Sequence, residues 1–269
     1  MYTSPLYSNE KIIGQMNNFG LKQVAPHILD LLEIAEREQI TYKSFLSMVL
    51  DTEVIGRNEK RRRRNFVGAH FPPAAKSLEE FDPSELKGGI SKSQINMLSE
   101  LDWIDKKCNV LLLGPPGVGK THLAVGLGLL AVQNGYTVCF ENMTNLIKIF
   151  DEAPYKQKQS FRLKNLLKAS LIIIDEIGYV PVTREQANKF FTFISETYEQ
   201  SAMIFTTNKD VTEWAELFGD PVITQAMLDR ILHHAKCFSL EGDSYRLKHP
   251  DLSSGTEHRK TVLPDHGKN

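Results

Sequence analysis

Apolar residues along the chain follow two different patterns, one before about residue 70 and one after residue 108. In the first part they recur at i, i+3, i+4 and i+7, the spacing of one buried helix face, as in Ile28, Leu31, Leu32 and Ala35. A second helix is expected to begin near Thr41 or Ser44 and to turn these residues inward: Phe45, Leu46, Val49, Leu50 and Val54. So few apolar residues cannot make a large core, and they predict a small helical domain over residues 1–70.

The second pattern consists of short apolar runs that alternate with stretches of helix length. The runs are Val110–Leu113, Thr137–Phe140, Leu171–Asp175, Met203–Thr206 and Cys237–Leu240. They predict an α/β domain over residues 90–248, with a mostly parallel five-stranded sheet covered by helices on both faces. Prolines and a Gly-Gly pair over residues 71–89 indicate a linker, and the polar residues 249–269 are expected to form a disordered tail.

The first of these strands runs directly into a glycine-rich loop, GPPGVGKT, which matches the phosphate-loop pattern G-x-x-x-x-G-K-[ST]. Glycine allows the backbone to wrap so that its N–H groups point at phosphate oxygens, and the following helix adds the positive end of its dipole. Lys120 is expected to bridge the β- and γ-phosphates of ATP, and the Thr121 hydroxyl to ligate Mg²⁺. The predicted loop residues are Gly114, Pro115, Pro116, Gly117, Val118, Gly119, Lys120 and Thr121.

Two further strands end in polar residues that can complete this site. The strand LIIIDE ends in Asp175, a second expected Mg²⁺ ligand, and in Glu176, which could orient and deprotonate the attacking water. The strand MIFTTN ends in Asn208, whose amide could position that water or contact the γ-phosphate. In the alternative interpretation, the acids simply mark where the strand reaches solvent and Asn208 only begins the next turn.

Composition limits the remaining possibilities. The net charge is −1, with 41% hydrophobic and 24% charged residues, so any contact with nucleic acid must come from local clusters. The three cysteines are far apart in sequence, which fits a reducing compartment and gives no disulfide framework. The longest apolar run, Leu123–Val132, is too short to cross a bilayer, and no signal peptide is visible. We therefore expect a cytoplasmic protein with no membrane contact.

The chain resembles the IstB/DnaC group of AAA+ ATPases in six motifs, which occur in this order: GPPGVGKTHLA, LIIIDEIGYVP, TTN, FGDP, MLDRILHHA and LEGDSYRLK. It is most similar to the IstB-like transposition helper ATPases, which are encoded beside the transposase in certain insertion sequences. The resemblance covers about residues 25–248. It implies an AAA+ P-loop fold, ATP and Mg²⁺ as cofactors, hydrolysis of ATP, and DNA and a transposase as partners.

The resemblance also implies that the ATP site lies between subunits. Arg230 in MLDRI matches the position of the arginine that a neighbouring subunit supplies, although it could also be an ordinary exposed helical arginine. Arg246 in GDSYR matches a second basic contact to the nucleotide, and His122 is expected to lie near it. Nucleotide that contacts two subunits favours their association, so we expect a ring or a filament.

Two basic segments are candidates for DNA binding. On the first, Lys60, Arg61, Arg62, Arg63 and Arg64 cannot all face one core, because successive helical residues are about 100° apart. The second, residues 155–170, contains no acid, and a helix would place these residues opposite its leucines: Lys158, Arg162, Lys164 and Lys168. Solvated faces or contacts with an acidic partner are the alternatives. Neither segment has interleaved aromatic residues, which favours sequence-tolerant contacts with the backbone of duplex DNA.

The sequence thus favours an ATPase that assembles on duplex target DNA, assists or recruits a transposase and disassembles on hydrolysis. A DnaC-like helicase loader is the first alternative, and a small-molecule P-loop kinase or a non-hydrolysing nucleotide switch is the second. The adjacent His233 and His234 cannot share one helical face, and no further ligands lie nearby in sequence, so no zinc site is expected.

Overall fold

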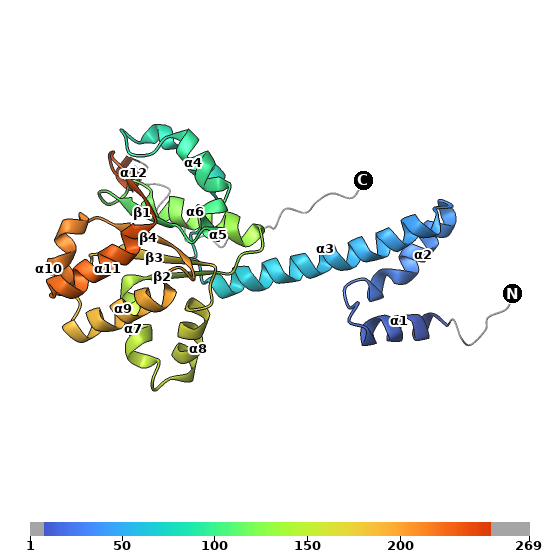
Figure 1. Ribbon diagram of the computed structural model, residues 1–269. Helices are drawn as coiled ribbons and strands as arrows, with labels where there is room; N and C mark the ends of the chain where they lie inside the picture. The colour runs from blue at the N-terminus through green and yellow to red at the C-terminus, as the bar shows by residue number, and fades with distance from the viewer. Residues whose placement is uncertain (1–7, 249–269) are drawn as a thin grey trace.

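A parallel sheet of five strands forms the centre of the α/β part of the molecule (Figure 1). The computed structural model describes residues 8–248. The strand order is β2-β3-β4-β1-β5, and every neighbouring pair is parallel. The strands are β1 (Asn109–Leu113), β2 (Val138–Asn142), β3 (Leu171–Ile177), β4 (Ala202–Thr207) and β5 (Ala235–Ser239). All five predicted runs form strands, so the predicted fold class is confirmed.

Helices cover both faces of the sheet because successive strand residues point to opposite sides and both sides are apolar. In β3, Ile173 joins the hydrophobic core on one face, and Ile172 and Ile174 join the core on the other. The first face carries α4 (Lys92–Ser99), α5 (Asp102–Asp105) and α6 (Lys120–Gln133). The second carries α7 (Met143–Glu152), α8 (Gln157–Leu166), α9 (Arg184–Thr197), α10 (Trp214–Phe218), preceded by the 3-10 turn η5 (Val211–Glu213), and α11 (Pro221–His233).

An N-terminal arm extends away from this α/β core (Figure 1). Its elements are α1 (Asn9–Asn18), the 3-10 turn η2 (Ala25–His27), α2 (Ile28–Arg37) and the 28-residue helix α3 (Tyr42–Ala69). Thr41 caps α3 by accepting a hydrogen bond from the Ser44 N–H, which confirms the predicted start of the helix.

The small hydrophobic cluster of the arm contains Val24, Ile28 and Val49. The expectation that the whole apolar face of α3 is buried is wrong, because the side chains of Leu46, Leu50 and Val54 are 58%, 49% and 54% exposed. The two shorter helices are too small to cover more than one strip of α3.

The segment expected to be a linker packs against the α/β core. It forms the 3-10 turns η3 (Leu78–Glu80) and η4 (Pro83–Glu85), and Leu78 and Phe81 contact the core cluster beside α6. A short helix, α12 (Tyr245–Lys248), closes the described part of the chain, and the predicted disordered tail lies outside the described residues. Among residues 8–248, no helix combines the length and the apolar content that a membrane crossing requires.

Candidate functional site

The phosphate loop lies between the end of β1 and the start of α6. Gly117 and Gly119 have φ angles of 84° and 94°, the left-handed region that favours glycine, so the loop needs these residues to turn. The Lys120 side chain is buried, and its Nζ donates to the carbonyl oxygens of Gly114 and Pro115 at 2.6 and 2.8 Å. The ammonium group is therefore already held inside the loop, where an anion would meet it.

A buried carboxylate faces the hydroxyl that follows the loop lysine. The Thr121 Oγ1 donates to both carboxylate oxygens of Asp175, at 2.9 and 3.1 Å, and the Thr206 hydroxyl also donates to Asp175. Asp175 is 4% exposed. A hydroxyl and a carboxylate at this separation are oxygen ligands of the kind that Mg²⁺ prefers, so these residues fit the predicted ion.

Strand β3 is irregular at Glu176, the residue after Asp175. The β3–β4 register shifts between Ile174 and Ile177, and Glu176 has a φ of 63°, an uncommon value for a residue with a Cβ. Its N–H donates to the Thr206 Oγ1 at 3.0 Å, which fixes the backbone, while its side chain is exposed. Glu176 thus carries an exposed carboxylate directly after Asp175, whose side chain contacts Thr121 of the loop.

Asn208 supplies the observation that best fits a bound group. Its Oδ1 is buried and has no hydrogen-bond partner among the described residues. A Cβ built on Gly178, two residues after Glu176, would lie 3.5 Å from this oxygen. An unpaired buried amide oxygen costs about 1–3 kcal/mol, which a water or ligand donor would recover. Thr121 and Asp175 therefore meet directly, and Asn208 lies beside Gly178 after the carboxyl end of β3, so its part in the site stays a prediction.

Comparisons with known proteins assign the chain to a family. The family model of the IstB-like ATP binding protein matches residues 14–253. The chain belongs to the IstB-like family of ATP-binding proteins. It is similar to the insertion sequence IS21 ATP-binding protein of Pseudomonas aeruginosa (38% identity, 87% of each chain). It is also similar to that of insertion sequence IS5376 of Geobacillus stearothermophilus (34% identity, 90% of this chain and 96% of the relative).

Solved structures show the fold that this IstB-like protein shares. The crystal structure of DnaI has a TM-score of 0.52 at 18% identity, covering 62% of this chain and 91% of DnaI. The AMPPCP-bound DnaA of Aquifex aeolicus has a TM-score of 0.51 at 17% identity, covering 71% and 58%. The expected AAA+ P-loop fold and the membership in an insertion-sequence family of ATP-binding proteins are thus confirmed.

Arg230 does not join the phosphate loop of its own chain. It lines a cavity with Asn109 and Met203, which lie where β1 and β4 begin, whereas the phosphate loop follows the other end of β1. Its guanidinium lies 5.1 Å from the centre of the Phe191 ring and donates to the Ala226 carbonyl oxygen at 2.8 Å. In this IstB-like chain, Arg230 lies apart from the phosphate loop that follows β1, and its predicted contact with the ATP of a neighbouring subunit remains a prediction.

The residues predicted to flank the nucleotide are placed only in part. The His122 Nε2 lies 2.8 Å from the Ser77 carbonyl oxygen, and its ring meets Phe81 edge-on, so His122 contacts the turn η3 and the residues beside it. The Tyr245 N–H donates to the Gly117 carbonyl oxygen at 3.0 Å, which brings α12 to the phosphate loop. Arg246 follows in α12, and its side chain lies outside the described residues.

Most of the predicted DNA-binding residues are exposed. They are Lys60, Arg61, Arg62, Arg63 and Arg64 on α3, Lys158 and Lys164 on α8, and Lys168 just after α8. Arg162 is the exception, because it is 5% exposed and its Nε donates to the Glu141 Oε1 at 2.6 Å. Its prediction as a DNA contact is wrong for the chain as folded.

Arg162 instead holds the end of the arm. Its Nη1 donates to the Gly68 carbonyl oxygen at 2.8 Å, and its Nη2 donates to those of Ala69 and Phe140 at 3.3 and 2.9 Å. The last carbonyl groups of a helix lack partners within it, and α3 obtains them from this guanidinium. One turn earlier, the Asn65 Nδ2 donates to the carbonyl oxygens of Gly135 and Tyr136. We call Arg162, Glu141 and Asn65 the arm clamp.

A second buried charge was missed by sequence reasoning. Glu53 on α3 is 4% exposed, and its carboxylate accepts hydrogen bonds from the backbone N–H groups of Gln23 and Val24 and from the Arg57 Nε at 2.6 Å. Burial by itself raises the pKa of Glu53, but the hydrogen bonds from Arg57, Val24 and Gln23 outweigh it and hold the pKa below its ordinary value. The one sequence signal for this contact is that Glu53 lies four residues after Val49, so an acidic residue shares the apolar face of the helix.

Proposed function

We propose that the chain is an ATP-dependent DNA-binding protein that assembles on duplex target DNA and assists or recruits a transposase. ATP hydrolysis then drives its disassembly. The observation that carries the ATPase part is the buried Asp175–Thr121 pair, beside the exposed Glu176 and the unpaired amide oxygen of Asn208. The names of the relatives, which refer to ATP binding in insertion sequences, support the link to transposition.

Each residue of the site has a separate task in this proposal. Lys120 and the loop N–H groups would bind the phosphates, and Thr121 and Asp175 would hold Mg²⁺, whose positive charge would offset that of the phosphates. Asn208 positions a water, whose oxygen attacks the γ-phosphorus while the bond to the β-phosphate oxygen breaks and ADP leaves. Glu176 accepts the proton of that water.

An arginine from a second copy would complete the site. We propose that the partner's Arg230 meets the charge that develops on the transferred phosphoryl group, an effect typically worth about 10³–10⁵ in rate. Because Arg230 lies at the edge of the sheet away from its own phosphate loop, this contact requires head-to-tail association. Head-to-tail copies form a ring when the rotation closes and a filament when it does not.

The exposed basic residues of α3 are proposed to contact DNA phosphates. Four consecutive arginines spread around the helix, so at most some of them face one DNA backbone at a time. The exposed Lys158, Lys164 and Lys168 would add contacts near the core. Such contacts carry little sequence information, so this binding would tolerate many DNA sequences.

Sedimentation of the purified protein with duplex or single-stranded DNA of equal length, with and without ATP, tests this proposal. Large complexes on duplex DNA that need ATP and dissociate on hydrolysis would support it. A preference for single strands would favour a helicase loader, and phosphate transfer to a metabolite without any effect of DNA would favour a kinase. Nucleotide binding without hydrolysis of ATP would favour a non-hydrolysing nucleotide switch.

The salt dependence of binding separates DNA contacts from protein contacts. Reversing Arg62 and Arg63 to Glu should make the negative slope of log K against log salt shallower by about 2 if each residue contacts one phosphate. Reversing the exposed lysines Lys11 and Lys43 at the far end of the arm is the matched control. An unchanged slope in the arginine variant would assign the run to a protein interface.

A further inference from the structure

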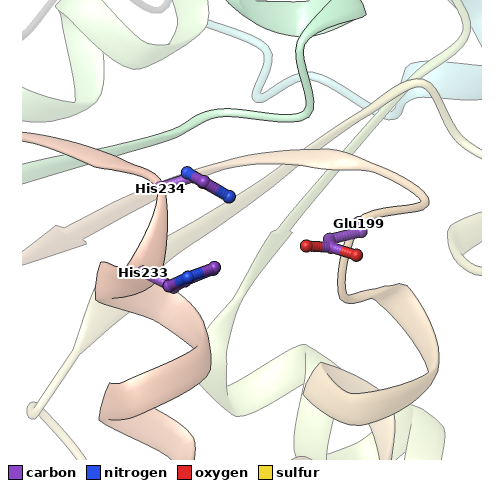
Figure 2. Close-up of side chains that lie close together, drawn as sticks. All are labelled: Glu199, His233 and His234. Carbon is purple, nitrogen blue, oxygen red and sulfur yellow. The ribbon is translucent and has the colours of Figure 1, made fainter.

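Three potential metal ligands meet at the end of the sheet where the strands begin. Glu199 follows α9, His233 ends α11, and His234 is the next residue, just before β5 (Figure 2). On a continuous helix, two adjacent histidines could not share one face. The helix ends at His233, and His234 has φ −129° and ψ 69°, so the two rings are free to approach and their centres lie 4.1 Å apart.

The distances within this cluster suit a metal ion after a small adjustment. One ligand atom from each residue, an imidazole nitrogen or a carboxylate oxygen, lies within 4.8 Å of the other two. Ligand atoms about 2.0–2.1 Å from a tetrahedral ion are about 3.3 Å apart, so the ligand atoms need to approach one another by at most about 1.5 Å. All three residues are exposed, and rotation about their side-chain bonds can supply this movement.

Neighbouring groups already orient two of the three ligands. The Tyr198 hydroxyl lies 2.8 Å from the His233 Nδ1. If Nδ1 donates to this hydroxyl, the lone pair of Nε2 is free to bind a metal, which is how outer groups commonly fix a ligand histidine. Glu199 has a φ of 55°, and the adjacent turn is held by hydrogen bonds from the N–H groups of Gln200 and Ser201 to the Thr197 carbonyl oxygen.

We propose that Glu199, His233 and His234 bind a divalent transition metal ion, with Zn²⁺ the best match. Two imidazole nitrogens and one carboxylate oxygen favour Zn²⁺ over Mg²⁺, which prefers oxygen ligands alone. Three protein ligands leave a fourth position for water or for a group from another molecule. The site is separate from the phosphate loop, because His234 lines the same cavity as Arg230 at the opposite edge of the sheet. A bound ion would tie the loop after α9 to the end of the helix that carries Arg230.

Calorimetric titration of Zn²⁺ into the full-length, metal-stripped chain without a polyhistidine tag tests the site. We expect His234→Gln and Glu199→Gln each to lose one equivalent of bound Zn²⁺ in the micromolar range. Tyr198→Phe should keep that equivalent but weaken its affinity by roughly 10- to 100-fold, the effect of removing an outer partner. The exposed His27 on η2 gives the matched control, His27→Gln, which should titrate as the unchanged chain does.

Two results of this titration would overturn the Zn²⁺ site. Equal stoichiometry and affinity in the unchanged chain, His234→Gln and Glu199→Gln would overturn the proposal, and so would a chain that binds no Zn²⁺. Unfolding midpoints measured in EDTA identify a variant that fails to fold. In that case the Zn²⁺ affinity of Tyr198→Phe decides, and an affinity equal to that of the unchanged chain would overturn the proposal. Acidification should release the ion, because imidazole must be unprotonated to bind a metal.

Discussion

Replacing Arg162 with Met tests the arm clamp directly. The substitution keeps an unbranched side chain but leaves the Glu141 carboxylate without its cation and removes the donor from the Gly68 and Phe140 carbonyl oxygens. Breaking a buried ion pair by removing one partner costs about 3–5 kcal/mol. At about 2–4 °C per kcal/mol for a chain of this size, we expect the unfolding midpoint to fall by about 6–20 °C.

Thermal unfolding followed by circular dichroism measures this effect, and DNA binding below the transition supplies the second readout. Lys164→Met is the matched control, because Lys164 is exposed on the same helix and its loss should change stability by at most about 0.5 kcal/mol. Arg162→Met with normal stability and weaker DNA binding would refute the clamp and restore Arg162 as a DNA contact. In the double variant with Glu141→Gln, the loss should be smaller than the sum of the single losses.

Three further predictions concern the ATP site and the arm. Lys120→Ala should abolish ATP-dependent assembly, and unchanged ATP affinity in equilibrium binding would count against the site. Glu176→Gln should bind ATP and remain assembled on duplex DNA with turnover reduced by at least about 100-fold, as expected for loss of a general base; normal phosphate release would remove Glu176 from that role. Because the pKa of Glu53 is depressed in the folded chain, its contribution is present above pH 4.5 and is lost as the pH falls below that value. Urea unfolding of Glu53→Gln should therefore show less loss of stability on acidification than the unchanged chain, and equal pH profiles would contradict this assignment.

The ATP site was predictable because its chemistry is local in sequence. A phosphate loop is one strand, one turn and one helix in succession, so the spacing of Gly114, Lys120 and Thr121 carries most of the information. Asp175 lies near the carboxyl end of β3 and Asn208 directly follows β4, and parallel strands place their carboxyl ends at one edge. What the sequence lacked was the backbone detail, such as the left-handed conformation of Glu176.

The sequence-based predictions fail where segments that are distant along the chain contact each other. Periodicity correctly placed Arg162 on a helix, but it could not show that the end of α3 docks there and requires a donor for its carbonyl groups. Glu53 and Glu199 depend in the same way on partners about 30 residues away along the chain. Leu46 was assigned to a core because an apolar side chain on a helix is usually buried, yet nothing in the short arm covers it.

The arm clamp makes α3 a lever. At 1.5 Å per residue, the 28 residues of α3 span about 42 Å, so a rotation of about 5° at the clamp moves the far end by roughly 4 Å. Asn65 donates hydrogen bonds to Gly135 and Tyr136, just after α6 ends. Because α6 begins at the phosphate loop, this helix connects the loop to the arm clamp. A small tilt of α6 on nucleotide exchange would be magnified at α1. Distances between spin labels on α1 and α9, measured with ATP and with ADP, would detect this movement of the arm. Identical distances in the two states would show that the arm does not move with the nucleotide.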